Sequence, residues 1–339
     1  MLHFDERYQV ERVGSGAHEA LDGIREQGGR VVARFERTLT VRAGNGRLLT
    51  LHGSDTLRTP FSLSLHASPP HWPGLDAIAS LHHAVHDEKH DETRDETLII
   101  GTLRVDLGAS RIGSADCLPT MAFSGPASAG WGEEQVVVPS AAVHLSQLKT
   151  WAATSAFGAW WRVEGPVTEA VAPSVATLVR LTGGAQLRAL VDALRQIDEP
   201  GAEDEAMALL GLGPGLTPSG DDALVGLFAA WLALDPPGLR HARGRGRSLL
   251  ASLVAHAPER TTPISAELLY HLARGRLSDP LRRLLVALAG DDESEVGAAA
   301  ASVAAWGHTS GRDGIAGVVA LLYATQTEPP PWRTTTYAA

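Results

Sequence analysis

The sequence is poor in cysteine and in long apolar runs, and each shortage excludes a class of protein. Cys117 is the one cysteine among 339 residues, so no intrachain disulfide forms and a thiolate zinc site is not expected. The longest apolar run, Ala223–Leu234, is too short for a membrane span, which needs ~20 residues. Residues 1–14 lack a basic start followed by an apolar run, so they do not resemble a secretory signal. We therefore expect a cytoplasmic protein without a membrane segment.

Positive charge is also in short supply. The net charge is −10 at pH 7 with histidine neutral. Nucleic acids are bound through clustered Lys and Arg, so a nucleic-acid partner is not expected. Hydrophobic residues make up 44% of the chain and charged residues 20%, which is enough apolar material for a sizeable core.

The two halves of the chain differ in hydrophobic pattern. From about residue 174 apolar residues recur at helical spacing, as in Leu187, Leu190, Val191 and Leu194. Before residue 163, short β-rich runs alternate with Gly, Pro, Asn and Asp, which predicts strands. These runs cover residues 31–43, 47–53, 61–67, 97–107 and 134–140. We predict an α+β protein with a β-rich, barrel- or sandwich-like domain over 1–170, an all-helical domain over 171–325 and a flexible tail over 326–339.

A charged insertion interrupts the β-rich part at residues 81–96. It contains His82, His83, His86 and His90 among several carboxylates. A helix here would align His82, His86 and His90 for metal binding. A solvated charged loop is the interpretation we favour, because the segment has few apolar residues to hold a fixed ligand set.

The helical half contains an internal repeat. Residues 215–227 read GLTPSGDDALVGL and residues 307–318 read GHTSGRDGIAGV; when Pro218 is skipped, they share T-S-G-x-D-x-[LI]-x-G. The matched pairs are Thr217 with Thr309, Ser219 with Ser310, Gly220 with Gly311, Asp222 with Asp313, Leu224 with Ile315, and Gly226 with Gly317. We predict two equivalent helix starts related by a pseudo-twofold axis.

Each copy of the repeat has the residues of a helix N-terminus. Ser219 and Ser310 suit the N-cap, and an aspartate follows three residues later, where it interacts favourably with the positive end of the helix. Such a cap stabilises a helix by ~1 kcal/mol. Gly226 and Gly317 fit close contact between helices.

Capping does not account for the loop before the first helix. Glycine lets a backbone approach a ligand, and free amides at a helix N-terminus bind anions. Asp221 is not needed for capping, and its counterpart in the repeat is Arg312. Residues 211–226 therefore predict a binding site for a small polar or charged molecule. The glycines and prolines that crowd this approach are Gly211, Gly213, Pro214, Gly215, Pro218 and Gly220.

This loop does not match the common nucleotide-binding motifs. Its first glycines are followed by Leu-Thr-Pro rather than by a helix, and no strand precedes them, which disfavours dinucleotide binding. The chain has no G-x-x-x-x-G-K-[ST] loop. The cofactor is unknown from the sequence. One hypothesis is Mg²⁺ held by Asp221, Asp222 and Asp313 and bridging to a phosphate.

A third polar segment, RTTPISAE at residues 260–267, lies between the two copies. Thr262 as N-cap, with Pro263 at the first helical position, explains part of it. Arg260, Thr261 and Ser265 are candidates for anion contacts, although the structural interpretation is the stronger one here.

No arrangement of a nucleophile with a base can be inferred from residue spacing. The catalytic residue is therefore unknown, with Asp221, His308 and Arg312 as candidates. His308 has the chemistry of a general acid or base, but a structural histidine is the interpretation we favour.

The three segments GLGPGLTPSGDDALVG, TTPISAELL and GHTSGRDGIAGVVALL resemble the hallmark segments of the AllH-like family, whose best-named member is a subunit of oxamate carbamoyltransferase in anaerobic allantoin degradation. The resemblance covers residues 200–325 closely, and the β-rich half only in general character. The insertion at 81–96 departs from the family pattern. The S-x-R-T phosphate motif of aspartate and ornithine transcarbamoylases is also missing.

The resemblance implies a subunit of a multi-subunit enzyme with FdrA-like and AllG-like partners. That enzyme transfers a carbamoyl group between oxalurate and phosphate, giving oxamate and carbamoyl phosphate. We predict that a small anionic carbamoyl, phosphate or carboxylate ligand binds at the paired helix N-termini. A non-catalytic metabolite-binding or regulatory subunit, and a structural subunit whose loop docks a partner, stay open as alternatives. The predicted ligand-binding residues are Gly213, Gly215, Thr217, Ser219, Gly220, Asp221, Asp222, Thr262, Ser265, Thr309, Ser310, Gly311 and Asp313.

Overall fold

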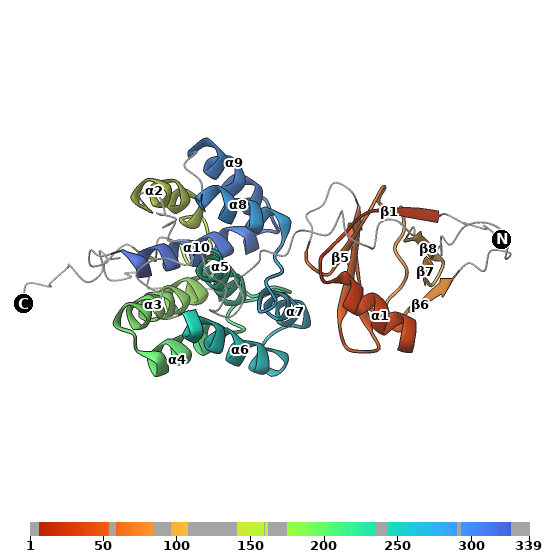
Figure 1. The fold of residues 1–339 in the computed structure, drawn as a ribbon, viewed down its shortest axis with the longest axis horizontal. Helices are drawn as coiled ribbons and strands as arrows, with labels where there is room; N and C mark the ends of the chain where they lie inside the picture. The colour runs from red at the N-terminus through yellow and green to blue at the C-terminus, as the bar shows by residue number, and fades with distance from the viewer. Residues whose placement is uncertain are drawn as a thin grey trace, which may run out of the picture. The chain divides into compact units, whose positions relative to one another are not determined.

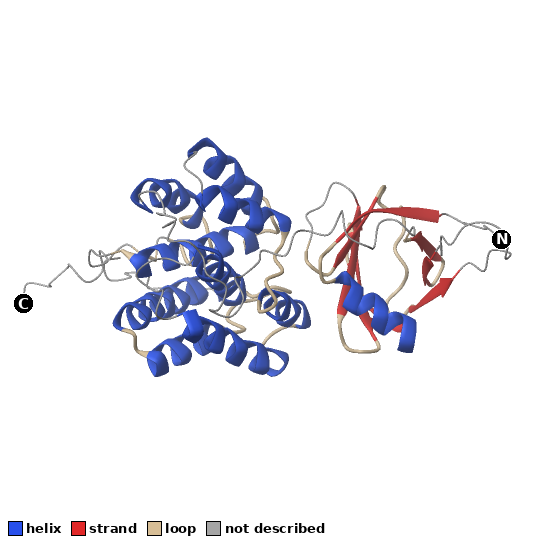
Figure 2. Cartoon of the chain, viewed as in Figure 1, coloured by secondary structure: helices blue, strands red, loops and turns tan. Residues whose placement is uncertain are grey.

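The structure is a computed structural model that describes residues 7–53, 59–83, 96–107, 141–158, 160–161, 175–234, 243–289 and 293–326. The chain divides into two compact units, residues 1–120 with 276–279 and residues 121–275 with 280–339. Strands gather in the first unit and helices in the second (Figure 2), which confirms the predicted α+β class. None of the helices within the described ranges is long and apolar enough to cross a membrane.

The first unit contains a closed barrel of eight strands. Neighbouring strands follow the order β1-β5-β4-β3-β2-β6-β7-β8, and the parallel pairing of β1 with β8 closes the ring. The run predicted at 97–107 forms two strands, because Gly101 (φ 57°) turns the chain in its middle. The strands are β1 Arg7–Val13, β2 Gly29–Arg34, β3 Thr38–Ala43, β4 Leu48–Gly53, β5 Ser62–Leu65, β6 Ile78–His83, β7 Glu96–Ile100 and β8 Leu103–Asp106.

The barrel shares its core with helix α1 (Ala17–Gln27). Leu21 and Ile24 of α1 are buried in the same cluster as strand residues such as Val41 and Leu51. A fully buried side chain of this size contributes ~1.5–3 kcal/mol to folding. The helix thus completes a core that the strands alone leave partly open.

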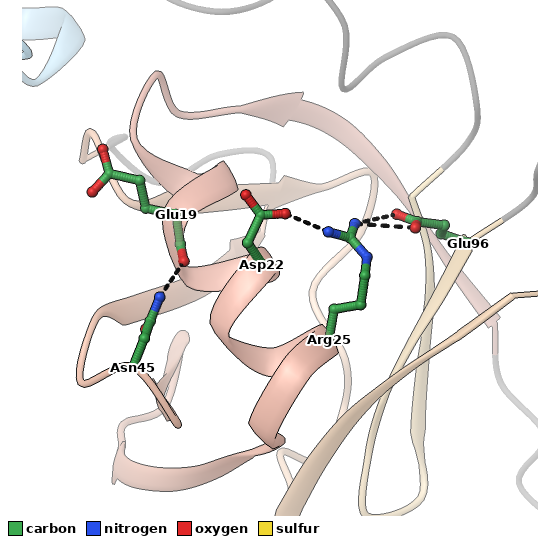
Figure 3. A network of polar contacts seen from close by, with 5 residues as sticks. All are labelled: Glu19, Asp22, Arg25, Asn45 and Glu96. Carbon is green, nitrogen blue, oxygen red and sulfur yellow. Dashed lines mark hydrogen bonds and ion pairs between the residues drawn. The ribbon is translucent and has the colours of Figure 1, made fainter.

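Polar contacts hold α1 on the strands, as Figure 3 shows. The guanidinium of Arg25 contacts Asp22 one turn earlier on α1 and Glu96 at the start of β7, with 3.1 Å between Nη2 and Oε1. The side-chain amide of Asn45, in the turn between β3 and β4, donates to the Glu19 carbonyl at 2.7 Å. The helix is therefore tied to two separate parts of the barrel.

Two expectations for the N-terminal half are corrected. The charged loop favoured over residues 81–96 is shorter than expected, because Leu81, His82 and His83 lie on β6, where His82 pairs with Thr97 of β7. Pairing with β7 extends the strand into the polar residues that the loop was expected to contain. The region expected to be β-rich up to residue 163 also contains helix α2 (Ala141–Ala152). Residues 84–95, with His86 and His90, lie outside the described residues, as do the run at 134–140 and the tail at 327–339.

The second unit is helical, and α5 and α10 lie at its centre (Figure 1). Helices α2, α3 and α9 contact α10, and α4, α6 and α7 contact α5. The apolar stripes predicted on α3, α5, α8 and α10 are buried, as in Leu187, Phe228, Leu284 and Val319. The helices after α2 are α3 Val175–Gln196, α4 Glu199–Leu209, α5 Ser219–Leu234, α6 Arg243–Arg260, α7 Pro263–Leu272, α8 Asp279–Ala289, α9 Glu293–Ala304 and α10 Ser310–Thr325.

Glycines bring the backbones of α5 and α10 into direct contact. A Cβ on Gly226 of α5 would lie 1.9 Å from the carbonyl oxygen of Gly314. A Cβ on Gly317 of α10 would lie 1.9 Å from the carbonyl oxygen of Ala223. Gly226 matches Gly317 in the sequence repeat, so the two contacts are equivalent under exchange of the copies. The two central helices therefore cross about a local pseudo-twofold axis.

We predict that Gly226→Ala lowers the free energy of unfolding of the helical unit by about 1–3 kcal/mol, because the methyl group forces two packed backbones apart. Gly297→Ala on α9 is the matched control, since a Cβ there meets no atom within 4 Å. The control is expected to raise stability by ~0.5–1 kcal/mol, the usual gain of alanine over glycine inside a helix. Urea unfolding of the full chain, followed by helical circular dichroism, measures both. Equal effects of the two substitutions would contradict the close contact.

Candidate functional site

The N-termini of α5 and α10 meet, and their polar side chains pair across the two helices. The hydroxyl of Thr217, just before α5, lies 2.8 Å from the hydroxyl of Ser310, the first residue of α10. Both hydroxyls interact with the carboxylate of Asp222 in the first turn of α5. One copy of the repeat thus supplies the acid, and the other supplies one of its hydroxyl partners.

The matched half of the site has the same arrangement. Asp313 in the first turn of α10 interacts with the hydroxyls of Ser219, from α5, and Thr309, from its own segment. Exchange of the two copies carries one set of residues onto the other, as the sequence repeat predicted. In this half the backbone amide of Ala156 also donates to Asp313 Oδ1 at 2.6 Å.

These cross-helix contacts replace the predicted capping boxes. Both helices begin at the serine itself rather than one residue later. The N-cap of α10 is Thr309, whose side chain makes no cap hydrogen bond. The amide of Asp313 donates to the Thr309 carbonyl at 2.9 Å, and the amide of Asp222 donates to the Pro218 carbonyl at 3.1 Å. Because these backbone bonds already satisfy the amides, the prediction that the serines are N-caps is wrong.

The acid pair is buried. Asp222 is 4% exposed and Asp313 is 0% exposed. Burial, and next the negative charge of Asp313, raise the pKa of Asp222 well above its ordinary value. Burial also raises the pKa of Asp313, although hydrogen bonds and the charge of Arg312 oppose that shift. The site therefore contains two interacting carboxyl groups that resist becoming charged together.

Asp221 has a different role from its neighbour. Its Oδ1 accepts the Gly211 amide at 2.7 Å, and its Oδ2 accepts the hydroxyl of Thr261. Burial raises the pKa of Asp221, and these bonds oppose the shift. The carboxylate thus joins the start of the glycine-rich loop to the segment before α7, and both of its oxygens are in use.

The third polar segment closes on the same loop. Thr262 is the N-cap of α7, with Pro263 in its first turn, as predicted. Its hydroxyl accepts the Ser265 amide at 3.2 Å and donates to the Leu216 carbonyl. Residues 211–221 and 260–265 are therefore held together, which supports the structural interpretation of the third segment.

The loop uses its glycines for backbone conformation. Gly211, Gly213 and Gly215 have φ values of 80°, 120° and 102°, which side-chain-bearing residues rarely adopt. Gly220 and Gly311 are needed for space, because a Cβ on them would lie 2.0 Å and 1.7 Å from a carbonyl oxygen of the preceding helix. Each central helix thus starts in close contact with the helix before it.

The two basic candidates lie at the start of α10. His308 is exposed, and its carbonyl accepts Nη1 of Arg312 at 3.4 Å. Arg312 is half-buried, and its Nε is buried without a hydrogen-bond partner. The charge of Arg312 acts on Asp313. Among the two candidates, Arg312 is therefore the one whose charge acts on the acid pair. His308 is exposed to solvent.

The hypothesis of a single metal site made of three carboxylates is not supported. Within the described ranges, no group of three or more His, Cys, Asp or Glu is arranged to hold a metal ion. Asp221 is turned to Gly211 and Thr261, so Asp222 and Asp313 form the pair without it. A cavity of about 330 Å³ lies apart from both motifs and is lined by residues of α3, α4, α5 and α6, such as Leu194, Glu203, Trp231 and Leu249.

Sequence reasoning missed the contribution of Ala156. This residue lies in a turn after α2, far from either motif in the sequence, and contributes only its backbone amide. Phe157 beside it is buried, and a Cβ on Gly183 of α3 would lie 2.5 Å from its ring. An aromatic packed on a glycine of another helix fixes the turn, and no local pattern reveals that contact.

We predict that stability falls as pH rises from about 4, the ordinary aspartate pKa, through the raised pKa values of the acid pair. Over that range the folded state holds more protons than the unfolded state, so the free energy of unfolding has a negative slope against pH. Asp222→Asn removes the titrating group and is expected to flatten the slope. Urea unfolding across this pH range, in buffer with a chelator, measures it. A wild-type slope that Asp222→Asn leaves unchanged would contradict the raised pKa.

The residues of this site lie within a part of the chain that matches a known protein family. No solved structure matches this chain. The three polar segments and both central helices fall almost entirely within residues 209–322. That range matches the model of the family described as oxamate carbamoyltransferase subunit AllH, so over these residues the resemblance predicted from the motifs is confirmed.

Proposed function

We propose that this chain is an AllH-like subunit of an oxamate carbamoyltransferase and that it binds a small anionic ligand at the N-termini of α5 and α10. The observation that carries the proposal is the coincidence of two independent findings. The family match covers residues 209–322. The fold brings the motifs of that range together, in contacts such as Thr217 with Ser310 and Asp221 with Thr261.

The chemistry of the site suits a carbamoyl compound. Two helix N-termini present amide dipoles that favour negative charge. Arg312 has a buried Nε without a partner, which suits a charge-assisted bond to a phosphate or carboxylate oxygen. A carboxyl group with a raised pKa, such as Asp222, also donates a hydrogen bond while it is protonated. Donors of this kind stabilise the oxyanion that develops during acyl transfer.

The reaction would join a phosphate oxygen to the carbamoyl carbon of oxalurate and break that carbon's bond to the oxamate nitrogen. The products are carbamoyl phosphate and oxamate. We propose FdrA-like and AllG-like subunits as the partners that complete the catalytic centre. The proposal assigns this chain ligand binding and orientation, and leaves the acid or base of the reaction to the assembled enzyme.

A non-catalytic metabolite-binding or regulatory subunit is the second candidate. It is favoured by the bonding of Asp221, whose two oxygens are occupied by Gly211 and Thr261. It is also favoured by the exposed position of His308. Turnover of oxalurate and phosphate separates the two candidates when it is measured for this chain alone and with the two partner subunits. A rate that requires this chain in the mixture and is lost in its Arg312→Gln variant supports the catalytic candidate.

We predict that carbamoyl phosphate, phosphate, oxamate or oxalurate raises the melting temperature of the full chain, because a ligand that binds only the folded state stabilises it. Each anion is tested with Mg²⁺ and with a chelator. Arg312→Gln is expected to weaken binding at least tenfold, since a hydrogen bond to a charged group contributes ~1.5–3 kcal/mol.

The control for this experiment is Arg30→Gln. It removes the same charge from an exposed position on β2 of the barrel. Binding that survives Arg312→Gln, or that both substitutions weaken equally, would contradict an anion site beside α10. The absence of a shift with all four anions, in both buffers, would contradict the proposed ligand class.

A further inference from the structure

We propose that the cavity lined by α3, α4, α5 and α6 binds a small, mainly apolar molecule that carries a hydrogen-bond acceptor and no negative charge. The inference goes beyond the proposed function and does not rest on it, because none of the residues that line the cavity belongs to the motifs at the N-termini of α5 and α10. It is supported by the walls of the cavity, the backbone of Ile197 and the indole of Trp231.

The cavity has the size and the walls of a small-molecule site. Its volume is about 330 Å³, and ligand pockets typically measure ~300–1,000 Å³. Apolar side chains such as Leu194, Ala202 and Leu249 form part of the lining, and charged and hydroxyl groups form the rest. A pocket of this mixed kind buries the apolar body of a ligand and orients it through a few polar groups.

Ile197 lines the cavity in a backbone conformation that isoleucine rarely adopts. Its φ of 60° lies in the left-handed region, where a β-branched residue is an outlier. The amide of Ile197 donates to the Leu194 carbonyl at 3.4 Å, and the next amide donates to the Ala193 carbonyl at 3.0 Å. This Schellman pattern usually has glycine at the left-handed position.

The side chain of Ile197 does not stabilise the fold in return for this strain. It is 59% exposed, so packing against the rest of the chain offsets little of the backbone cost. Strained residues cluster at ligand sites, where their side chains are needed for contact with the ligand. A strained and exposed isoleucine beside a cavity therefore indicates an apolar contact that a bound molecule completes.

Trp231 lines the same cavity with an unsatisfied donor. The residue is 2% exposed, and its Nε1 is buried without a hydrogen-bond partner among the described residues. The ring is fixed, because it stacks on Phe228 with 5.8 Å between centroids, and a Cβ on Gly246 of α6 would lie 2.9 Å from it. A buried indole N–H usually has a partner. An acceptor atom on the ligand supplies the partner that is missing.

The charges of the lining determine which molecules fit. Nε of Arg245 lies 2.5 Å from Oε1 of Glu199, so this pair is balanced. Glu203 accepts the Ser252 hydroxyl at 2.6 Å, a bond that adds no positive charge. Because carboxylates outnumber the guanidinium, the lining disfavours an anion and favours an uncharged or cationic molecule. The charged residues of the lining within the described ranges are Asp198, Glu199, Glu203 and Arg245.

The indole N–H signal of Trp231 tests the site directly. The full chain is isotope-labelled in its tryptophan side chains, and the magnetic resonance signal that is missing from Trp231→Phe is assigned to Trp231. The probes are benzamide and cyclohexanecarboxamide, two uncharged molecules with an apolar body and a carbonyl acceptor. We expect each amide to shift this signal saturably. The absence of a saturable shift with both amides would overturn the proposal.

Benzoate and cyclohexanecarboxylate are the matched anions, because each has the body of one amide and a negative charge. They are expected to bind about fivefold more weakly than the amides at low ionic strength, where exposed charges are least screened. Glu203→Gln keeps an oxygen for the Ser252 hydroxyl and is expected to narrow this difference. Carboxylates that bind the wild-type chain as tightly as the amides, or a difference that Glu203→Gln leaves unchanged, would overturn the proposed ligand class.

Ile197→Gly separates ligand binding from stability. Glycine adopts the left-handed conformation without strain, so the melting temperature of the chain without ligand is expected to rise by about 2–4 °C. Loss of the side chain is expected to weaken binding of both amides about tenfold, the effect of one apolar contact in a binding pocket. Amide binding that this variant leaves unchanged, or a lower melting temperature, would contradict a strained side chain kept for a ligand.

Val286→Ala is the matched control. It removes an apolar side chain of α8 that is 52% exposed and does not line this cavity. Its affinity for both amides is expected to equal that of the wild type. A loss equal to that in Ile197→Gly would show that the amides bind exposed apolar surface in general, and would overturn the proposal.

The cavity site and the proposed anion site fail separately. Amides that shift the Trp231 signal, while no anion raises the melting temperature, leave the cavity site standing and remove the proposed anionic ligand. Anions that bind beside α10, while neither amide shifts the signal, do the reverse.

Discussion

The contact between the backbones of α5 and α10 is the constraint on which the site depends. Gly226 lies against Gly314, and Gly317 lies against Ala223, without room for a Cβ at either glycine. Each helix begins about two turns before this crossing. Because the crossing is so close, the first turns of α5 and α10 also come together. The pairing of Thr217 with Ser310 at 2.8 Å is the direct result. A larger residue at the crossing would separate the two N-termini and with them the acid pair.

The buried acid pair lowers the stability of the folded state, and the contacts around it offset that loss. Two interacting carboxyl groups are buried, and each retains an oxygen without a partner. Around them the loop is held firmly, through Asp221 to Gly211 and Thr261, and through Thr262 to Leu216. A protein that needed only two joined helices would gain stability from apolar residues in place of such a pair. A buried polar arrangement that local packing does not require is typical of a functional site.

These features give a physical basis to the segment that matches the AllH family model. Its sequence motifs fix backbone contacts and cross-helix hydrogen bonds, so their conspicuous glycines and aspartates have distinct structural roles. The proposed anion would bind between the N-termini of α5 and α10, where the helix dipoles favour negative charge. The barrel unit is built separately around α1 and its own apolar core.

Much of the fold could be predicted from the sequence, because it depends on local patterns. Apolar residues at helical spacing located α3, α5, α8 and α10, and short β-rich runs located the strands from β2 to β5. The cap of α7 was also predictable, since Thr262 and Pro263 act on the turn that follows them. Helix α2 was missed, because its weak amphipathic pattern lies in a segment surrounded by β-rich runs.

The sequence alone determined that residues 215–227 and 307–318 are equivalent helix starts. Only the tertiary structure decided what their polar side chains contact. A serine or aspartate at a helix N-terminus can satisfy its own helix or a neighbouring one, and local spacing does not distinguish the two. Here the Pro218 and Thr309 carbonyls take the amides that the predicted caps would have used. The side chains are therefore free to pair across helices whose residues, such as Thr217 and Ser310, lie 93 positions apart in the sequence.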